Sequence, residues 1–392
     1  MNPIVLTGCT PEPLMSYLKA IGVLRLVSEQ VDPAARGCSR DGVFVFMSSL
    51  DNHRLIRFLE EEYRPTPIVA PWGARSGFFA GSPEKTAREA LKSIVDNNSE
   101  RLGPPRSMIR EVQSLLRELG LGEKATEEAK TELMRVCRTR LPDSILRWLD
   151  TCYVLTEDSR RFPPLLGTGG NEGSGSYVSG FAQQVVACVI DRKHDTALRA
   201  ALFAGAHSGV CSSQTPGHFS PNAAGGANSG QGFEGPVTTN AWDYVLSMEG
   251  ACLWASAVSR RQEVGGRGMA AFPFTVRVTG AGHGALGLRD SVKPKQAKRE
   301  IAEIWLPVWS QFLGLGELAS LLSEGRASVG QRAAETGLDL ARATARLGVE
   351  RGITQFQRVA FLMRNGQSFL GVSLGSFAVC PRDNAASGVS HK

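Results

Sequence analysis

The sequence lacks the short motifs that mark the common nucleotide-dependent and metal-dependent enzymes. It contains no G-x-x-x-x-G-K segment and no H-E-x-x-H segment, and its six histidines are scattered singly. The eight cysteines never form a C-x-x-C pair, which argues against a zinc site and against a disulfide framework. We therefore expect no metal, no other cofactor and no catalytic residues.

Long apolar runs and a basic leader are also missing. No run approaches the ~20 apolar residues that cross a bilayer, and the N-terminus MNPIVLTGCT lacks the basic region of a signal peptide. We expect a cytoplasmic protein without membrane contact. Neither sign of charge dominates, because 44 Lys and Arg against 38 Asp and Glu give a net charge of +6. This balance permits binding to a polyanion without requiring it.

Two weak enzyme motifs occur in the wrong context. The pattern G-x-G-x-x-G is present at 230–235 and at 282–287, but neither copy lies between a strand and a helix of a βαβ unit. The pattern G-x-S-x-G occurs once, at 371–375, where no helical pattern follows and the only downstream histidine is His391. We interpret Ser373 as part of an ordinary strand.

The sequence does contain many amphipathic patterns separated by glycine-rich loops. With 392 residues and 42% apolar content, the chain is long enough for two or three cores. We predict an α+β fold that is mostly helical, with small mixed sheets and long glycine-rich loops. The predicted regions are a mixed α/β region at 1–82, an inserted helical bundle at 83–161, a domain of glycine-rich loops and a buried helix at 162–380, and a disordered tail at 381–392.

Apolar periodicity and turn signals place the individual elements. Strands are predicted at 4–6, 43–47, 271–278 and 368–374, the third at a sheet edge because Pro273 lies near its start. Helices are predicted from Thr10 to about 30, at 51–63, 83–97, 105–119, 123–140, 142–150, 178–191, in a segment ending near 204, and at 240–261 and 326–349.

Three glycine-rich loops interrupt these elements. The first is RPTPIVAPWGARSGFFAG at 64–81, and the second is PPLLGTGGNEGSGSY at 163–177. The large loop, 207–240, has seven glycines and three prolines between 208 and 240, and a single charged residue, Glu234. A loop this long inside a compact domain is usually functional or disordered. Because it leads into a helix that is apolar nearly all round, we expect it to be held in place, with Phe219 and Phe233 as tethers.

Two charged features stand out near these loops. Glu249 is the only charge between 244 and 259 of the buried helix. It is either a general base or a structural group that accepts loop N–H groups or pairs with an arginine, and we favour the structural role, together with Trp242 on the same face. A basic cluster within seven residues comprises Lys293, Lys295, Lys298 and Arg299. Such a cluster is either an ordinary solvated surface or a phosphate contact.

Several long segments resemble the large subunit of the type I-G CRISPR Cascade surveillance complex, formerly called I-U. They are LTGCTPEPLMSYLKAIGVLRLVSEQ, EEYRPTPIVAPWGARSGFF, PNAAGGANSGQGF, NAWDYVLSMEGA and ARLGVERGITQFQRVAFLMRNGQSFLGVSLG. The resemblance runs from about Leu6 to Leu374. It implies a non-enzymatic subunit of an RNA-guided antiviral complex, which reads the protospacer-adjacent motif of target duplex DNA and helps to form the R-loop.

The same resemblance implies the partners. They are CRISPR RNA, target double-stranded DNA, the backbone and other Cascade subunits, and a separate helicase-nuclease. Members of the family continue beyond the strand at Ser368 into a further helical region, whereas this sequence stops in a polar tail. Either this is a short form, or the small-subunit role belongs to another chain.

The resemblance supplies no recognition map, so the candidate nucleic-acid-binding residues follow from chemistry. Asn and Gln can read adenine edges or grip sugar, while Arg and Lys hold phosphates. The candidates are Arg75, Ser76, Asn171, Asn222, Asn228, Gln231, Lys293, Lys295, Lys298, Arg299, Arg342 and Arg346. Two other functions stay open: a phosphate-handling enzyme that uses the loops as an anion cradle with Glu249 as general base, and a structural scaffold whose loops bind neighbouring subunits.

Overall fold

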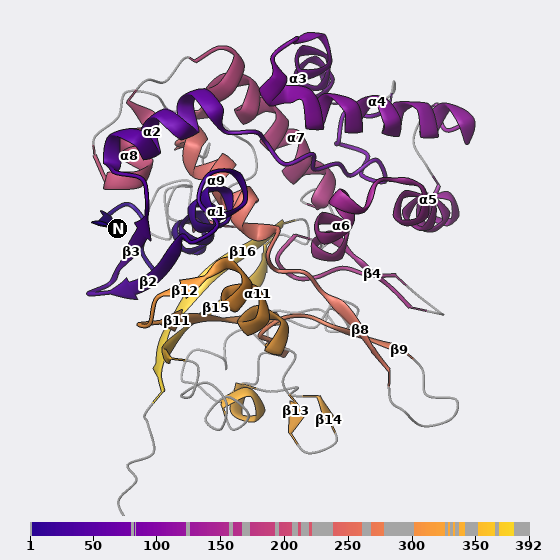
Figure 1. Cartoon of the computed structure of the whole chain (residues 1–392). Helices are drawn as coiled ribbons and strands as arrows, with labels where there is room; N and C mark the ends of the chain where they lie inside the picture. Colours follow the sequence, from indigo (N-terminus) through magenta and orange to yellow (C-terminus); the bar gives the residue numbers. More distant parts are fainter. Residues whose placement is uncertain are drawn as a thin grey trace, which may run out of the picture.

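The computed structural model describes most of the chain. The described residues are 2–79, 82, 84–122, 126–156, 160–166, 173–192, 196–205, 211–212, 219–221, 238–260, 268–277, 302–325, 328–329, 332–333, 337–341, 352–364 and 368–379. Helices gather in one part of the molecule and the longest strands in another, with α1 and α9 between them (Figure 1). This arrangement confirms the predicted α+β class with mostly helical content.

Most of the helices follow the predicted patterns. They are α1 (Leu14–Gln30), α2 (Asn52–Arg57), α3 (Lys85–Asp96), α4 (Gly103–Glu118), α5 (Glu127–Arg140), α6 (Leu146–Cys152), α7 (Ser174–Val185), α8 (Ala197–Phe203), α9 (Ala241–Ala251) and α11 (Leu315–Glu324). Two π-helical turns, η1 (Phe58–Glu62) and η4 (Val186–Ile190), extend α2 and α7, and two 3-10 turns, η2 (Glu100–Leu102) and η3 (Asp143–Ile145), precede α4 and α6.

Every strand pair among the described residues is antiparallel, so the predicted mixed sheets are antiparallel instead. One sheet has the order β1-β3-β2-β12, from β1 (Asn2–Leu6), β2 (Arg36–Arg40), β3 (Val43–Ser48) and β12 (Leu313–Gly314). The other has the order β10-β11-β15-β16, from β10 (Thr275–Arg277), β11 (Ala302–Trp309), β15 (Ile353–Arg364) and β16 (Ser368–Ala378). Four short pairs complete the set: β4 (Val154–Leu155) with β5 (Arg160–Arg161), β6 (Cys211–Ser212) with β7 (Thr238–Thr239), β8 (Ala257–Arg260) with β9 (Gly268–Ala271), and β13 (Ser328–Val329) with β14 (Arg332–Ala333).

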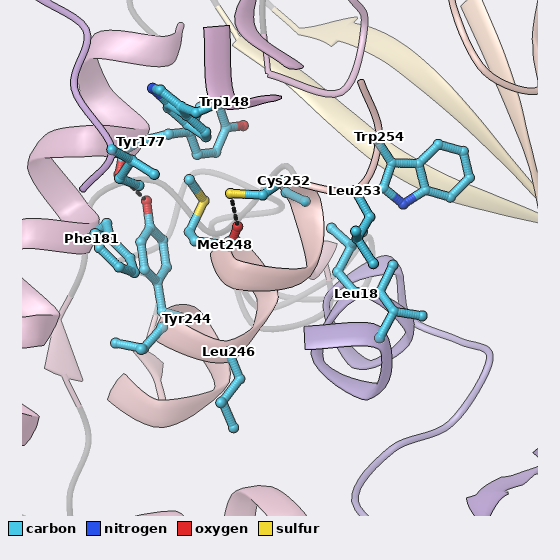
Figure 2. Packing of buried hydrophobic residues seen from close by; sticks show 14 of the residues in the cluster. Leu18, Trp148, Tyr177, Phe181, Tyr244, Leu246, Met248, Cys252, Leu253 and Trp254 are labelled. Carbon is cyan, nitrogen blue, oxygen red and sulfur yellow. Dashed lines mark hydrogen bonds between the residues drawn. The ribbon is translucent and has the colours of Figure 1, made fainter. Parts of the chain in front are cut away.

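The core is organised around the crossing of α1 and α9. A Cβ atom on Gly22 would lie 2.0 Å from the carbonyl oxygen of Leu246, and one on Gly250 would lie 1.9 Å from that of Leu18. Only glycine at both positions allows the two backbones to come this close. Figure 2 shows Leu18 of α1 beside Trp254, just beyond α9. One cluster of buried residues extends from Ile4 to Phe361 and joins the described parts of the first three predicted regions.

The predicted helix at 240–261 is wrong in its second half. Helix α9 ends at Ala251, and strand β8 begins at Ala257. The apolar residues after α9 are explained by packing of another kind, because the Trp254 ring lies 6.3 Å from the Tyr17 ring and contacts Phe274 edge-on. Buried apolar residues therefore continue past the end of the helix, and the sequence pattern could not distinguish a buried helix from a buried segment that follows it.

The predicted helix at 326–349 is also wrong in its first part. The antiparallel pair β13 and β14 occupies this stretch. Within the described part of this range, only 337–341 is helical.

The other differences concern boundaries and missed strands. Helix α1 begins at Leu14 rather than at Thr10. The strand predicted at 271–278 is divided between β9 and β10, with Phe274 in a left-handed conformation (φ 47°) between them. Strand β10 does lie at a sheet edge, as the position of Pro273 predicted. Strands β2, β11 and β15 were not predicted. Strand β11 is buried along nearly its whole length, so it lacks the alternation of apolar and polar residues that marks a half-buried strand, whereas β2 (RGCSR) contains a single apolar residue.

No helix in the described part of the chain is long and apolar enough to cross a membrane.

Candidate functional site

The described parts of the three glycine-rich loops meet at the start of α7. Trp72 of the first loop donates a hydrogen bond from its indole nitrogen to the Ser174 hydroxyl, at 2.9 Å. The next residue, Gly73, approaches Gly175 so closely that a Cβ atom on Gly73 would lie 2.6 Å from the Gly175 Cα. Because a side chain at either glycine would overlap the other backbone, this contact between the first and second loops requires glycine at both positions.

The large loop reaches the same place through Phe219. Its ring stacks on the Tyr177 ring of α7, with centroids 5.1 Å apart, and its carbonyl accepts a 3.0 Å hydrogen bond from the Met15 backbone nitrogen. Tyr244 of α9 donates to the Tyr177 carbonyl at 3.1 Å, as Figure 2 shows. Phe219 is fully buried and contacts both α1 and α7, as expected for a tether. The second predicted tether, Phe233, lies outside the described residues.

The ends of the large loop are fixed side by side. Strands β6 and β7 pair Cys211 with Thr239, which closes the loop at its base. Asn240 then begins α9, because its side-chain oxygen accepts the Trp242 backbone N–H at 3.0 Å. The same amide donates to the Ala197 carbonyl of α8 at 2.6 Å. The described residues on the two sides of 213–237 therefore lie next to each other.

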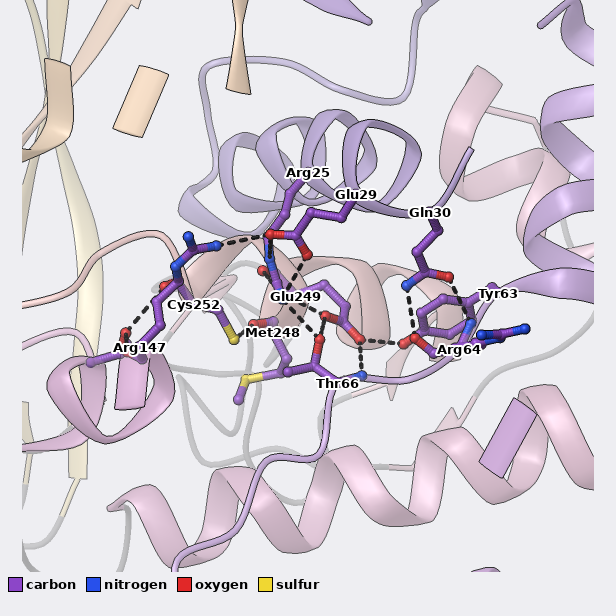
Figure 3. A network of polar contacts seen from close by, with 11 residues as sticks. Arg25, Glu29, Gln30, Tyr63, Arg64, Thr66, Arg147, Met248, Glu249 and Cys252 are labelled. Carbon is purple, nitrogen blue, oxygen red and sulfur yellow. Dashed lines mark hydrogen bonds and ion pairs between the residues drawn. The ribbon is translucent and has the colours of Figure 1, made fainter. Parts of the chain in front are cut away.

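Glu249 of α9 joins the first loop to the two core helices. Its side chain is fully buried and forms a 2.9 Å ion pair with Arg25 of α1. One carboxylate oxygen accepts the Tyr63 hydroxyl at 2.5 Å and the Thr66 backbone N–H at 2.9 Å, and the other accepts the Thr66 hydroxyl (Figure 3). The carboxylate thus holds the entry of the first loop, the position where η1 ends and 64–81 begins.

The network extends outward through α1. Arg25 also contacts Glu29, at 3.1 Å, and Glu29 accepts a 2.8 Å hydrogen bond from Arg147 of α6. Gln30 exchanges two 2.9 Å hydrogen bonds with the backbone of Arg64. Figure 3 shows these contacts on both sides of Glu249. The first loop is therefore fixed at its beginning by side chains of α1 and α9.

The protonation states favour a structural role for this network. Burial, followed by the neighbouring Glu249 carboxylate, raises the pKa of Tyr63 well above its ordinary value, so the phenol stays a hydrogen-bond donor. Burial alone lowers the pKa of Arg25, but its neighbours Cys252, Glu249 and Glu29 raise it overall. The guanidinium therefore stays charged. Because four donors already occupy the Glu249 carboxylate, it offers no free oxygen to a substrate.

A second buried ion pair lies at the other end of the α1–α9 contact. Lys19 of α1 is 5% exposed at its side chain and contacts Asp243 in the first turn of α9 at 2.6 Å. Asp243 also suits the positive end of the helix dipole. The two helices are thus tied by one ion pair near the base of the large loop and by another near the first loop.

The structure places four of the predicted site residues. Arg75 is partly exposed and lies 3.6 Å from Glu84, so it remains accessible at the first loop. Ser76 is buried, and its hydroxyl donates to the Gly73 carbonyl at 2.7 Å; its assignment as a nucleic-acid contact is corrected to a contact within the loop. Trp242 and Glu249 are both buried in the core. The remaining candidates lie outside the described residues: Asn171, Asn222, Asn228, Gln231, Lys293, Lys295, Lys298, Arg299, Arg342 and Arg346.

Sequence reasoning missed the residues that connect the loops. Arg25 carried a usable signal, because it is a lone arginine in the apolar stretch of α1 just as Glu249 is a lone acid in α9. Tyr63, Thr66, Trp72 and Ser174 carried none, since nothing in the sequence relates the first loop to the second.

Metal ligands do not gather at this site. Among the described residues, no group of three or more His, Cys, Asp or Glu side chains could hold a metal ion. No family model matches the chain, and no curated protein matches it either.

Proposed function

We propose that this chain is the large, non-enzymatic subunit of a type I-G CRISPR antiviral complex, in which it binds target duplex DNA and recognises the protospacer-adjacent motif. The observation that carries the proposal is the meeting of three glycine-rich loops at the start of α7. Loops that converge on one rigid frame can contact a single extended ligand together. Glycine-rich backbone presents N–H groups without side-chain bulk, which suits close approach to phosphate oxygens.

The proposal divides the work between the loops and the basic cluster. Arg75 of the first loop, together with Lys293, Lys295, Lys298 and Arg299, supplies charge for the phosphate backbone. Asn222, Asn228 and Gln231 of the large loop and Asn171 of the second loop supply the amides that can read adenine edges. Pairing of the guide RNA with the target reads the rest of the sequence, so the protein needs only a short recognition element.

The assembly follows from the same resemblance. The chain would bind CRISPR RNA and the backbone and other Cascade subunits, aid R-loop formation, and present the opened target to a separate helicase-nuclease in the cytoplasm. A chain that performs these steps needs binding surfaces rather than a reaction centre.

The buried position of Glu249 argues against the phosphate-handling enzyme. A general base must reach the proton that it removes, whereas this carboxylate is enclosed and bound by Arg25, Tyr63 and Thr66. We expect the purified chain to have no nuclease, ATPase or transferase activity. Assays with divalent metals on single-stranded and double-stranded DNA test this, and cleavage that follows the chain through purification and is lost in Glu249→Gln would contradict it.

The contact between Gly73 and Gly175 gives a structural test of loop-based recognition. We expect Gly175→Ala to push the first loop away from α7, because the added Cβ would lie 2.8 Å from the Gly73 Cα. Gly173→Ala is the matched control, since a Cβ there meets no atom within 4 Å. The measurement is the affinity of the reconstituted complex for duplexes with right and wrong adjacent motifs. The difference between these two affinities should disappear in Gly175→Ala and persist in Gly173→Ala.

Assembly must be measured on the same samples. If Gly175→Ala keeps assembly and full motif preference, the converged loops do not carry recognition. If it abolishes assembly while the DNA affinity of the complexes that still form is unchanged, the scaffold function is correct.

A further inference from the structure

One face of the sheet β10-β11-β15-β16 carries an arginine and three aromatic rings. Trp305 of β11 lies opposite Arg358 of β15, and Phe356 of β15 lies opposite Phe377 of β16. Residues directly opposite each other in antiparallel strands share a face, as do residues two apart along one strand. All four side chains therefore project from the same face. The ring contacts agree, because the centroid of Trp305 lies 5.7 Å from that of Phe356 and 5.2 Å from that of Phe377.

The guanidinium of Arg358 is fixed in place on this face. Its Nε donates to a carboxylate oxygen of Glu303 at 2.5 Å, and its Cζ lies 5.2 Å from the centre of the Trp305 ring. The Glu303 side chain is buried, whereas that of Arg358 is 34% exposed. Through its two Nη atoms, Arg358 forms no hydrogen bond to a described residue. A guanidinium held in this way presents both nitrogens as a pair of donors, which suits the oxygens of a phosphate group.

Phe377 adds an exposed aromatic surface near this arginine. It is 39% exposed, whereas Trp305 is buried. A Cβ atom on Gly337 would lie 3.0 Å from Cζ2 of Trp305, so the described segment 337–341 helps to bury that ring. Arg358 and Phe377 both contact Trp305, and both stay accessible. An exposed ring that can stack on a base, with an arginine beside it for the backbone, is the combination by which sheet surfaces bind single-stranded nucleic acid.

We propose that this face binds single-stranded nucleic acid, with a base stacked on Phe377 and a phosphate held by Arg358. A duplex could use the arginine but not the ring, because its bases are already stacked on one another. In an RNA-guided complex the strand is either the guide RNA or the displaced DNA strand, which share this chemistry. The inference goes beyond the recognition of duplex DNA by the glycine-rich loops and does not depend on it.

Removal of the exposed ring tests the stacking. Fluorescence anisotropy measures the affinity of the purified chain for labelled oligothymidylate DNA and oligouridylate RNA of about 10 nucleotides. Phe377→Ala should weaken binding by roughly 5- to 100-fold, because a stacked base loses its platform. Leu119→Ala is the matched control, since Leu119 is equally exposed and lies at the end of α4, away from the sheet (Figure 1). Tighter binding of RNA would identify the guide as the strand, and tighter binding of DNA the displaced strand.

A lysine at position 358 separates phosphate binding from a purely structural ion pair. Arg358→Lys keeps a positive charge for the buried Glu303 carboxylate but lacks the planar pair of donors. We expect the oligonucleotide affinity to fall several-fold while guanidinium denaturation shows little change in the free energy of unfolding. If Arg358 only balances Glu303, the lysine variant will bind as the native chain does. Arg36→Lys is the control, because Arg36 pairs with Glu317 at 3.1 Å on another sheet.

Several results would overturn the proposal. They are a native chain that binds neither oligonucleotide, native affinity in either Phe377→Ala or Arg358→Lys, and a control that loses as much affinity as its matched variant. Excess unlabelled duplex should leave the oligonucleotide bound, whereas complete displacement would mean that the strand occupies the duplex site instead. Loss of duplex recognition with intact oligonucleotide binding would contradict the proposed function and leave this site in place.

Discussion

Replacing Glu249 by glutamine tests how the first loop is held. The change keeps the shape of the side chain but removes its charge and turns one acceptor oxygen into an N–H₂ donor. That donor would face Arg25, Tyr63 or Thr66, all of which donate to the carboxylate in the native structure. Glu249→Gln therefore breaks a buried ion pair and leaves at least one buried donor without an acceptor.

The expected loss of stability is large. Removing one partner of a buried ion pair typically costs about 3 to 5 kcal/mol, and glutamine retains one acceptor, so we expect a loss of about 3 kcal/mol in the free energy of unfolding. Glu317→Gln is the control, because Glu317 pairs with Arg36 at 3.1 Å with both side chains about half exposed. Exposed pairs contribute about 1 kcal/mol or less.

Guanidinium denaturation measures both free energies, and amide hydrogen exchange adds the local readout. In Glu249→Gln, amide exchange should accelerate first in 64–79, because Tyr63 and Thr66, which bind the Glu249 carboxylate, lie at the start of this loop. If the two variants lose equally little stability and 64–79 exchanges at the native rate, the network around Glu249 does not hold the first loop, and the reasoning is wrong.

Further predictions concern packing and pH. Gly22→Ala should destabilise the chain by about 1 to 3 kcal/mol or more in thermal or denaturant unfolding, because the new methyl group overlaps the Leu246 carbonyl, whereas Gly316→Ala, in open space within α11, should be neutral or stabilising. Burial raises the pKa of Cys252 from 9.0 to about 12. The folded thiol keeps its proton where the unfolded thiol loses it, so its stabilising contribution is complete below pH 9.0 and is lost as pH rises toward about 12, with a slope of up to about 1.4 kcal/mol per pH unit. Cys252→Ala should reduce the decline of unfolding free energy above pH 9.0; an unchanged slope would show that another group causes it.

The sequence predicted the helical framework because helices carry a local signal. The apolar stripe of α1 and the cap at Asp51, whose side chain accepts the Arg54 N–H at 2.7 Å, can both be identified from neighbouring residues. The prediction failed where burial came from distant contacts. Trp254 packs against Tyr17 and Phe274 from a position beyond the helix. Its apolar character continued the helical pattern in the sequence, so the predicted helix extended past the true end of α9.

The candidate site was only partly predictable for the same reason. Each glycine-rich loop was visible alone, and a lone Glu249 in an apolar helix indicated a buried partner. Which loop the carboxylate would hold could not be predicted, since it depended on long-range contacts that bring Arg25 of α1 and Thr66 of the first loop to Glu249. The meeting of Gly73 with Gly175 depends on contacts between segments 102 residues apart, as the bond from Trp72 to Ser174 shows.

The most direct measurement of the central claim is the affinity of the reconstituted complex for target duplexes with right and wrong adjacent motifs across a salt series. In one variant, alanine replaces the basic cluster of Lys293, Lys295, Lys298 and Arg299. This variant should bind both duplexes more weakly and to the same extent, and the salt dependence of its affinity should flatten by ~0.9 log unit for each phosphate that the protein no longer neutralises. Replacing Asn228 and Gln231 by alanine should reduce the advantage of the correct motif by ~1 to 3 kcal/mol for each bidentate base pairing removed and leave the salt slope unchanged. Full motif preference in the Asn228 and Gln231 variant, with normal assembly, would contradict recognition by the large loop, and unchanged DNA binding in both variants would contradict the proposed function itself.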